Sequence, residues 1–214
     1  MPFAFPSHQG LIAPLWRRWP HWYDMPAMCV GAAMPDVIDG AIGLTQGHLG
    51  QTWGHTLIGM VLLCVPFGVP IWFGLHAFAR KVPRARGAGF WGRSWNLGND
   101  AIQACRGPAE FARAWPLVLW SLLVGSFSHL FFDLLSHGEK HAGFKWFRPW
   151  DVELELFPAW WDHAWFQMPV PGYPGGYSFA PHFIVWCIFG VLGAWMLYRP
   201  AFKRPRPDTQ KDDA

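Results

Sequence analysis

The chain alternates between long apolar stretches that hold no charged side chain and shorter segments that hold nearly all the charges. The uncharged stretches cover residues 40–79, 114–132 and 163–198. A helix that crosses a lipid bilayer needs about 20 mostly apolar residues, and each stretch is long enough for one. The pattern therefore predicts an all-α polytopic membrane helix bundle with three full transmembrane helices, over 56–79, 115–135 and 182–198.

The N-terminal residues 1–44 predict a short helical hairpin, because two brief apolar segments flank a turn bounded by prolines. Ser7 is placed to cap a first helix that ends near residue 19, and residues 20–26 form the turn. The second apolar segment is predicted to end at Pro35, because the residue before a proline disfavours helical dihedral angles.

The charges between the predicted helices indicate the orientation. Residues 80–113 carry seven basic and two acidic side chains, whereas residues 136–181 carry three basic and five acidic ones. Because Lys and Arg concentrate in short cytoplasmic loops, we place the 80–114 loop and the C-terminus in the cytoplasm and 136–181 outside. The aromatic segment 160–181 is expected to be an interfacial loop at headgroup level, not a strand. The charged, proline-rich tail 199–214 is expected to be disordered.

The composition agrees with a single membrane domain over 1–198. Hydrophobic residues make up 52% of the 214 residues and charged residues 14%, against about 25% charged in soluble domains. This argues against an ordinary soluble enzyme and against a disordered chain. The net charge of +3 resides in loops, so no nucleic-acid partner is expected. Four cysteines without a CxxC pair argue against a disulfide framework or a thiolate zinc site.

The clearest chemical motif lies in the second predicted transmembrane helix. His129, Asp133 and His137 are spaced four residues apart, which places all three on one helix face. Ionisable side chains are costly at membrane depth and face the bundle interior, and nitrogen and oxygen donors on one face suit zinc, manganese or iron. The alternative is a hydrogen-bonded pair in which Asp133 only orients a neighbouring histidine.

Four further donors flank apolar segments nearer the N-terminus. Asp36 and Asp39 follow a helix-breaking proline and repel each other unless a cation neutralises them, although the same dipeptides are common in polar turns. His55 begins the first long helix and His8 the N-terminal one, where the alternative is a cap or an interfacial side chain. By the predicted topology all these donors lie toward the outer membrane face, together with the 129–137 motif. Their number is enough for one metal with supporting residues, or for two metals.

The blocks that carry these residues resemble a known family. MPFAFPSHQGLIAPL resembles the opening of an uncharacterised bacterial integral-membrane family whose members begin MPF-T-x-S-H, and later blocks of that family resemble GAAMPDVIDG, GHTLIG and GSFSHLFFDLLSH. The same order of blocks is similar to that of a broader group, the membrane-bound metal-dependent hydrolases. That group is often likened to the all-helical zinc-dependent phospholipase C proteins.

The resemblance spans residues 1 to about 141 and implies a metal site. The residues that match position by position are His8, Asp36, His55, His129, Asp133 and His137. Asp39 matches the block of the broader group only with altered spacing. The broader group also carries an Arg ahead of its middle His, and Gln51-Thr52-Trp53-Gly54-His55 has none, so an anion-binding role for an arginine at that position is absent here.

The first functional hypothesis is a metal-dependent hydrolase of the bacterial cytoplasmic (inner) membrane. It would hold a divalent metal, with zinc favoured over manganese or iron, and act on a lipid or envelope ester or phosphoester. In it the ligands are Asp36, His55, His129 and Asp133, while His137 or His8 is a ligand or the general base.

Two other hypotheses remain open at this stage. In a non-enzymatic membrane subunit of a larger complex, the same His and Asp residues form a structural polar network, and aromatic side chains contact lipid or protein. An ion or proton pathway requires polar residues that continue to the cytoplasmic side, where the first long helix offers only His76.

Overall fold

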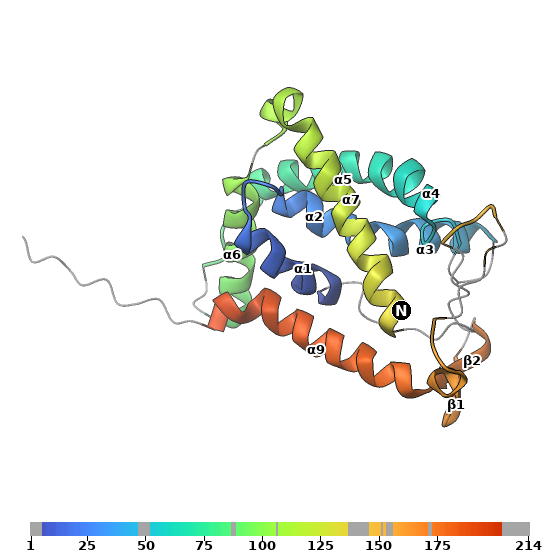
Figure 1. The fold of residues 1–214 in the computed structure, drawn as a ribbon. Coiled ribbons are helices and arrows are strands. Elements are labelled where there is room, and N and C mark those ends of the chain that lie inside the picture. The colour runs from blue at the N-terminus through green and yellow to red at the C-terminus, as the bar shows by residue number, and fades with distance from the viewer. Residues whose placement is uncertain are drawn as a thin grey trace, which may run out of the picture.

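The computed structural model describes residues 6–46, 52–86, 89–105, 107–136, 146–150, 152, 156–170 and 173–202. The described chain is mostly helical (Figure 1), as predicted. In chain order its elements are α1 (Ser7–Arg18), α2 (Met25–Gly31), α3 (Met34–Gln46), α4 (Leu57–Gly59), the π-helical turn η1 (Met60–Cys64), α5 (Val65–Lys81), α6 (Phe90–Ala104), the short 3-10 helix η2 (Pro108–Glu110), α7 (Phe111–Ser136), the 3-10 turn η3 (Ala159–Asp162), β1 (Phe166–Val170), β2 (Tyr173–Phe179) and α9 (Pro181–Phe202).

Four helical stretches of the described chain are long and apolar enough to cross a membrane: Met25–Gln46, Leu57–Lys81, Phe90–Ser136 and Pro181–Phe202. The last three contain the transmembrane helices predicted from the charge pattern. The multi-pass, all-α fold is therefore confirmed, and the first of the four is a span that the sequence did not predict.

This additional span exists because Pro35 does not end the second apolar segment. After a two-residue turn behind α2, Pro35 occupies the second position of α3. A proline is tolerated in the first helical turn, where its missing N–H has no helical partner in any case, so the prediction of a helix end was wrong. The hairpin itself forms: α1 ends at Arg18, and Asp24 caps α2 by accepting a hydrogen bond from the Ala27 N–H.

Three further expectations need correction. Ser7 is the first residue of α1 and makes no capping hydrogen bond. The predicted 80–114 loop contains the helix α6, which lies across the ends of α5 and α9 (Figure 1). The predicted disordered tail begins too early, because α9 continues to Phe202. The remaining tail, 203–214, lies outside the described residues.

The aromatic segment near the third predicted span contains a β-hairpin, so the expectation of a loop without strands was wrong. Strands β1 and β2 pair antiparallel, with Phe166 opposite Phe179. Their rings stack with centroids 4.4 Å apart, and the Trp165 N–H donates to the Phe179 carbonyl at 2.7 Å. Aromatic cross-strand pairs stabilise such a ladder. Here that stabilisation outweighs the low strand propensity of the neighbouring prolines and glycines.

The helices approach one another closely at glycines, as is typical of helices that pack in lipid. A Cβ atom on Gly10 of α1 would lie 1.7 Å from the Gly193 carbonyl oxygen of α9. Likewise, a Cβ atom on Gly125 of α7 would lie 2.3 Å from the Met28 carbonyl oxygen of α2. These two contacts fix α1 against α9 and α2 against α7. They set the relative positions of the N-terminal hairpin and the long helices.

A buried polar contact ties α2, α5 and α7 together. The Asp24 carboxylate accepts from the Trp72 indole N–H at 2.9 Å, and the Asp24 backbone N–H donates to the Ser121 hydroxyl at 2.8 Å. Trp72 is fully buried in the main apolar core. Interhelical hydrogen bonds of this kind hold membrane helices in register, and here they hold α7, which carries two of the side chains described next, against α2 and α5.

Candidate metal centre

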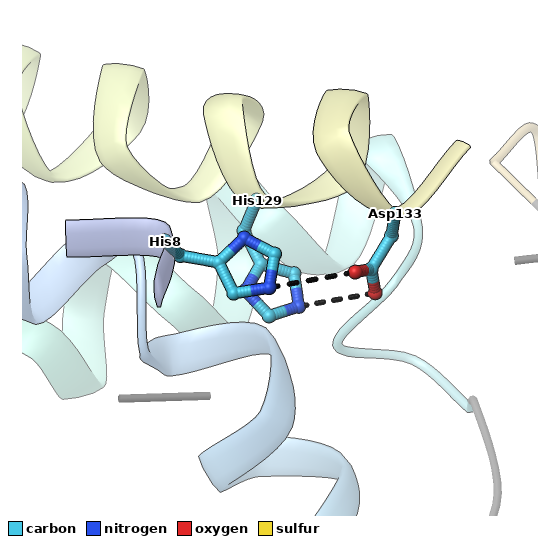
Figure 2. Close-up of side chains that lie close together, drawn as sticks. All are labelled: His8, His129 and Asp133. Carbon is cyan, nitrogen blue, oxygen red and sulfur yellow. Dashed lines mark ion pairs between the residues drawn. The ribbon is translucent and has the colours of Figure 1, made fainter. Parts of the chain in front are cut away.

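Six of the seven predicted site residues meet inside the bundle. His8 comes from α1, Asp36 and Asp39 from α3, His55 from the turn before α4, and the last two, His129 and Asp133, from α7. Figure 2 shows His8 and the α7 pair lying side by side, with the imidazole rings directed at the Asp133 carboxylate. The seventh, His137, lies outside the described residues.

Four of these side chains converge on one point. The Nε2 atoms of His55 and His129 lie 3.2 Å apart. The Asp133 Oδ2 atom lies 3.1 Å from the first and 3.2 Å from the second. The Asp36 Oδ1 atom lies 3.6 and 3.5 Å from the same two nitrogens. Both imidazoles therefore contact both carboxylates.

The far side of each imidazole is held by an acceptor. His55 Nδ1 donates to Asp39 Oδ2 at 2.7 Å, and His129 Nδ1 donates to the Ala32 carbonyl oxygen at 2.8 Å. A carboxylate and a carbonyl only accept hydrogen bonds, so in each ring the proton resides on Nδ1. This is the arrangement that orients histidines in metal sites, where the outer ring N–H donates to a carboxylate or a carbonyl.

The consequence is that only acceptors face one another at the centre. With Nδ1 protonated, each neutral imidazole presents a lone pair at Nε2, and the neighbouring carboxylate oxygens also offer lone pairs. Asp36 Oδ1 is buried and accepts no hydrogen bond from the described residues. Such a group is stable only with a cation among the atoms or with extra protons on the rings. Among the residues that the structure describes, Asp36, His55 and His129 form one of two His/Asp groups close enough to hold a metal ion.

Asp39 lies behind His55 and does not face the convergence point. Its carboxylate also accepts from the Thr52 N–H at 2.7 Å, the Thr52 hydroxyl at 2.6 Å and the Gly54 N–H at 2.5 Å. A Cβ atom on Gly54 would lie 2.4 Å from the Pro35 carbonyl oxygen, so no larger residue fits there. Asp39 therefore binds the loop before α4 and orients His55, whereas the sequence had grouped it with the metal ligands.

His8 lies at the edge of the cluster. Its ring stacks on that of His129, with centroids 4.0 Å apart, and its Nε2 atom lies 3.5 Å from Asp133 Oδ1 (Figure 2). The Asp133 carboxylate thus turns one oxygen to the central pair and the other to His8. His8, His129 and Asp133 form the second group with metal-binding spacing.

The side chains at the centre of the cluster are more deeply buried than those at its edge. The side chains of His129, His55 and Asp133 are 0–4% exposed, whereas those of Asp36 and His8 are 12% and 13% exposed. Burial lowers the pKa of the His55 imidazole, but the contacts with Asp133 and Asp39 outweigh burial and hold that pKa above its ordinary value. In the metal-free protein His55 therefore retains a proton more readily than a free histidine does.

Sequence reasoning missed the residues that support the histidines. The Ala32 carbonyl belongs to the backbone, so no side-chain pattern marks it. Thr52 and Gly54 stand directly before His55 in the sequence, but their hydrogen bonds to Asp39 depend on how α3 meets the loop. His182, at the start of α9, is also buried.

Comparison with known proteins places the chain in a family. The family described as Domain of unknown function (DUF4184) matches residues 1–150. The chain belongs to this family. The DUF4184 match includes all seven predicted site residues and ends before β1, β2 and α9. No curated protein and no solved structure matches the chain.

Proposed function

We propose that the protein is a membrane-embedded, metal-dependent hydrolase that acts on an ester or phosphoester of a lipid or envelope component. The observation that carries the proposal is the 3.2 Å approach of His55 Nε2 to His129 Nε2 while both Nδ1 atoms donate to other groups. A divalent cation at this point would bind both lone pairs and neutralise the adjacent carboxylates.

The donor set favours zinc, with manganese or iron as alternatives. Two imidazole nitrogens and two carboxylate oxygens are the ligands that these metals share. Zinc bonds of about 2.0–2.1 Å in a tetrahedral site put neighbouring donor atoms roughly 3.3 Å apart. Five of the six distances among these four atoms, all but the one between the two carboxylate oxygens, are 3.1–3.6 Å, which fits that spacing. Asp36, His55, His129 and Asp133 would hold the metal, with Asp39 and the Ala32 carbonyl orienting the two rings.

The residues at the edge of the centre suit proton transfer. A bound divalent metal lowers the pKa of water and polarises an ester or phosphoryl oxygen. His8 Nε2 is within 3.5 Å of Asp133 Oδ1, and this ring is the most exposed of the cluster. We assign His8 as the group that accepts the proton of the attacking water and returns it to the leaving oxygen. Water thereby adds across the cleaved bond, and the products are an acid and an alcohol. The sequence also offered His137 for this role.

The distribution of basic residues supports a proposed orientation of the protein in the membrane. The basic residues of 80–113 and the tail favour a cytoplasmic location for those segments, and the bacterial family resemblance favours the cytoplasmic (inner) membrane. The metal centre would then lie toward the outer face, among the apolar helices. A substrate that reaches it from the bilayer is most simply a lipid.

One specific observation favours the competing function, a non-enzymatic membrane subunit of a larger complex. The central side chains are almost completely buried, and protons on the two Nε2 atoms would satisfy the same contacts as a metal. In that case the cluster is a structural network that joins α1, α3 and α7. The two functions differ in metal content and in hydrolysis.

Hydrolysis by the purified protein tests the proposal. The protein in detergent is loaded with zinc and assayed on p-nitrophenyl esters and on bis(p-nitrophenyl) phosphate, beside the variant Asp133→Asn. The control is Asp100→Asn, because Asp100 is an exposed carboxylate of α6 that pairs with Arg84. Metal-dependent turnover that is lost in Asp133→Asn and kept in Asp100→Asn supports the hydrolase. Turnover that is unchanged by Asp133→Asn or by a chelator contradicts it.

A further inference from the structure

The described arginines and lysines are distributed unevenly between the two ends of the bundle. α1 and α5 start near the metal centre and end in basic residues, and α7 runs the other way, with its basic residue near the start. The residues at the far end, including those on or before α6 and at the end of α9, are Arg17, Arg18, Arg80, Lys81, Arg84, Arg86, Arg93, Arg113 and Arg199. Arg148 is the exception among the described residues, because it lies at the end that carries the metal centre.

Two contacts hold the segment of Arg148 against the loop that carries His55. The Leu57 N–H donates to the Trp146 carbonyl oxygen at 2.9 Å. The Arg148 guanidinium lies over the Trp53 ring, 5.3 Å from its centroid. These contacts fall two residues after and two residues before His55, and two residues of chain span at most about 7 Å. Arg148 therefore lies directly beside the metal-binding loop.

The backbone of Trp53, whose ring lies against the guanidinium, is held by hydrogen bonds. The Trp53 carbonyl oxygen accepts from the Thr56 N–H at 3.2 Å and from the Thr56 hydroxyl at 2.9 Å, which closes a tight turn around His55. An arginine stacked on an aromatic face keeps the N–H groups at its edge available for hydrogen bonds. No described carboxylate lies within ion-pair distance of Arg148.

The net charge of the metal centre makes a nearby cation such as Arg148 favourable for binding an anion. Asp36, Asp39 and Asp133 bring three negative charges, and a divalent metal brings two positive ones, so with neutral imidazoles one negative charge is left over. An anionic substrate is repelled by that charge unless a cation lies near the centre. Arginine is suited to this role because its planar fork matches phosphate oxygens.

We propose that Arg148, stacked on Trp53, binds the phosphate group of the substrate beside the metal centre, which makes the substrate a phosphoester and not a neutral carboxylic ester. This inference rests on the proposed hydrolase function. The phosphate source is either a phospholipid headgroup or a small soluble phosphate compound.

Phosphate binding tests this inference without requiring turnover. Titration calorimetry on the zinc-loaded protein in nonionic detergent uses inorganic phosphate in one arm and phosphatidic acid in the same micelles in the other. The variant Arg148→Gln is expected to weaken binding about tenfold or more, because a charge-assisted hydrogen-bonding partner is lost. Arg148→Lys, which keeps the charge without the fork, should be intermediate. Tighter binding of phosphatidic acid than of phosphate identifies a phospholipid headgroup, and the reverse identifies a soluble source.

The matched control is Arg199→Gln. Arg199 lies over the Trp195 ring, 5.1 Å from its centroid, at the other end of the bundle, so this change removes the same kind of contact far from the centre. The inference is overturned if both variants lose phosphate affinity equally, or if Arg148→Gln keeps the affinity of the wild type. It is also overturned if the wild type binds neither probe, or if Arg148→Gln loses its bound zinc. If the wild type binds no zinc, the proposed hydrolase function is contradicted. If that zinc-free protein still binds phosphate through Arg148, the anion site is supported by itself.

Discussion

His55 and His129 point their Nε2 atoms at each other across 3.2 Å, although they are 74 residues apart in the chain. Each ring is fixed from behind, one by the Asp39 carboxylate and the other by the Ala32 carbonyl. In the proposed function these two lone pairs, held at the centre of an apolar bundle, bind a divalent cation.

Asp39 should control metal affinity without being a ligand. Asp39→Asn keeps the shape but weakens the hydrogen bond to His55 Nδ1, so His55 becomes a poorer and less well-oriented donor. Loss of such a supporting carboxylate lowers metal affinity by about 10- to 100-fold. Competition with a chromogenic zinc chelator measures this change. An affinity equal to that of the wild type would show that Asp39 serves only the loop.

His8 should affect turnover more than metal binding. His8→Gln removes the proton acceptor next to Asp133, and loss of a general base lowers kcat by about 10²- to 10⁴-fold. Zinc content should remain near that of the wild type, because the four converging atoms do not include His8. If zinc is lost together with activity, His8 is a ligand and the assignment of its role is wrong.

Metal affinity should depend on pH in a definite direction. The pKa of His55 in the metal-free protein is held above its ordinary value of 6.5, so metal must displace a proton as pH falls through that raised pKa. Zinc affinity should therefore decrease as the pH is lowered toward 6.5 and level off at higher pH. Calorimetry in buffers of different ionisation enthalpy measures the released protons. Proton-independent binding across this interval would contradict a metal at His55.

The α1–α9 contact should matter for the position of His8. A Cβ atom on Gly10 would lie 1.7 Å from the Gly193 carbonyl oxygen, whereas one on Gly74 would meet nothing within 4 Å. Gly10→Ala should therefore displace α1, lower the thermal stability and reduce turnover, and Gly74→Ala should do neither. Thermal unfolding in detergent and the hydrolysis assay give the two readouts. If both variants have the same thermal stability and turnover, the close contact at Gly10 does not determine the position of α1.

The helices and the main donors could be predicted from the sequence because each depends on local pattern. Uncharged stretches located α5, α7 and α9, and the four-residue spacing placed His129 and Asp133 on one face of α7. The continuation of α3 beyond its proline could not be predicted, because the same residue both ends helices and starts them.

The finer features of the centre depend on tertiary register. Asp36 and Asp39 stand three residues apart in one block of the sequence, and only the path of the loop before α4 directs one to the convergence point and the other to the back of His55. The Ala32 carbonyl has no side-chain signal at all. Arg148 lies outside the blocks that carry the His and Asp residues, and its place beside Trp53 follows from a backbone contact with α4.

Metal stoichiometry tests the central claim most directly. The protein is purified in detergent without affinity metals, and its zinc, manganese and iron are measured by inductively coupled plasma mass spectrometry, beside His129→Gln and Asp100→Asn. The account predicts about one bound metal or more per chain in the wild type and in Asp100→Asn, and loss of that metal in His129→Gln. A wild type that holds no stoichiometric transition metal, even after incubation with zinc, would contradict it.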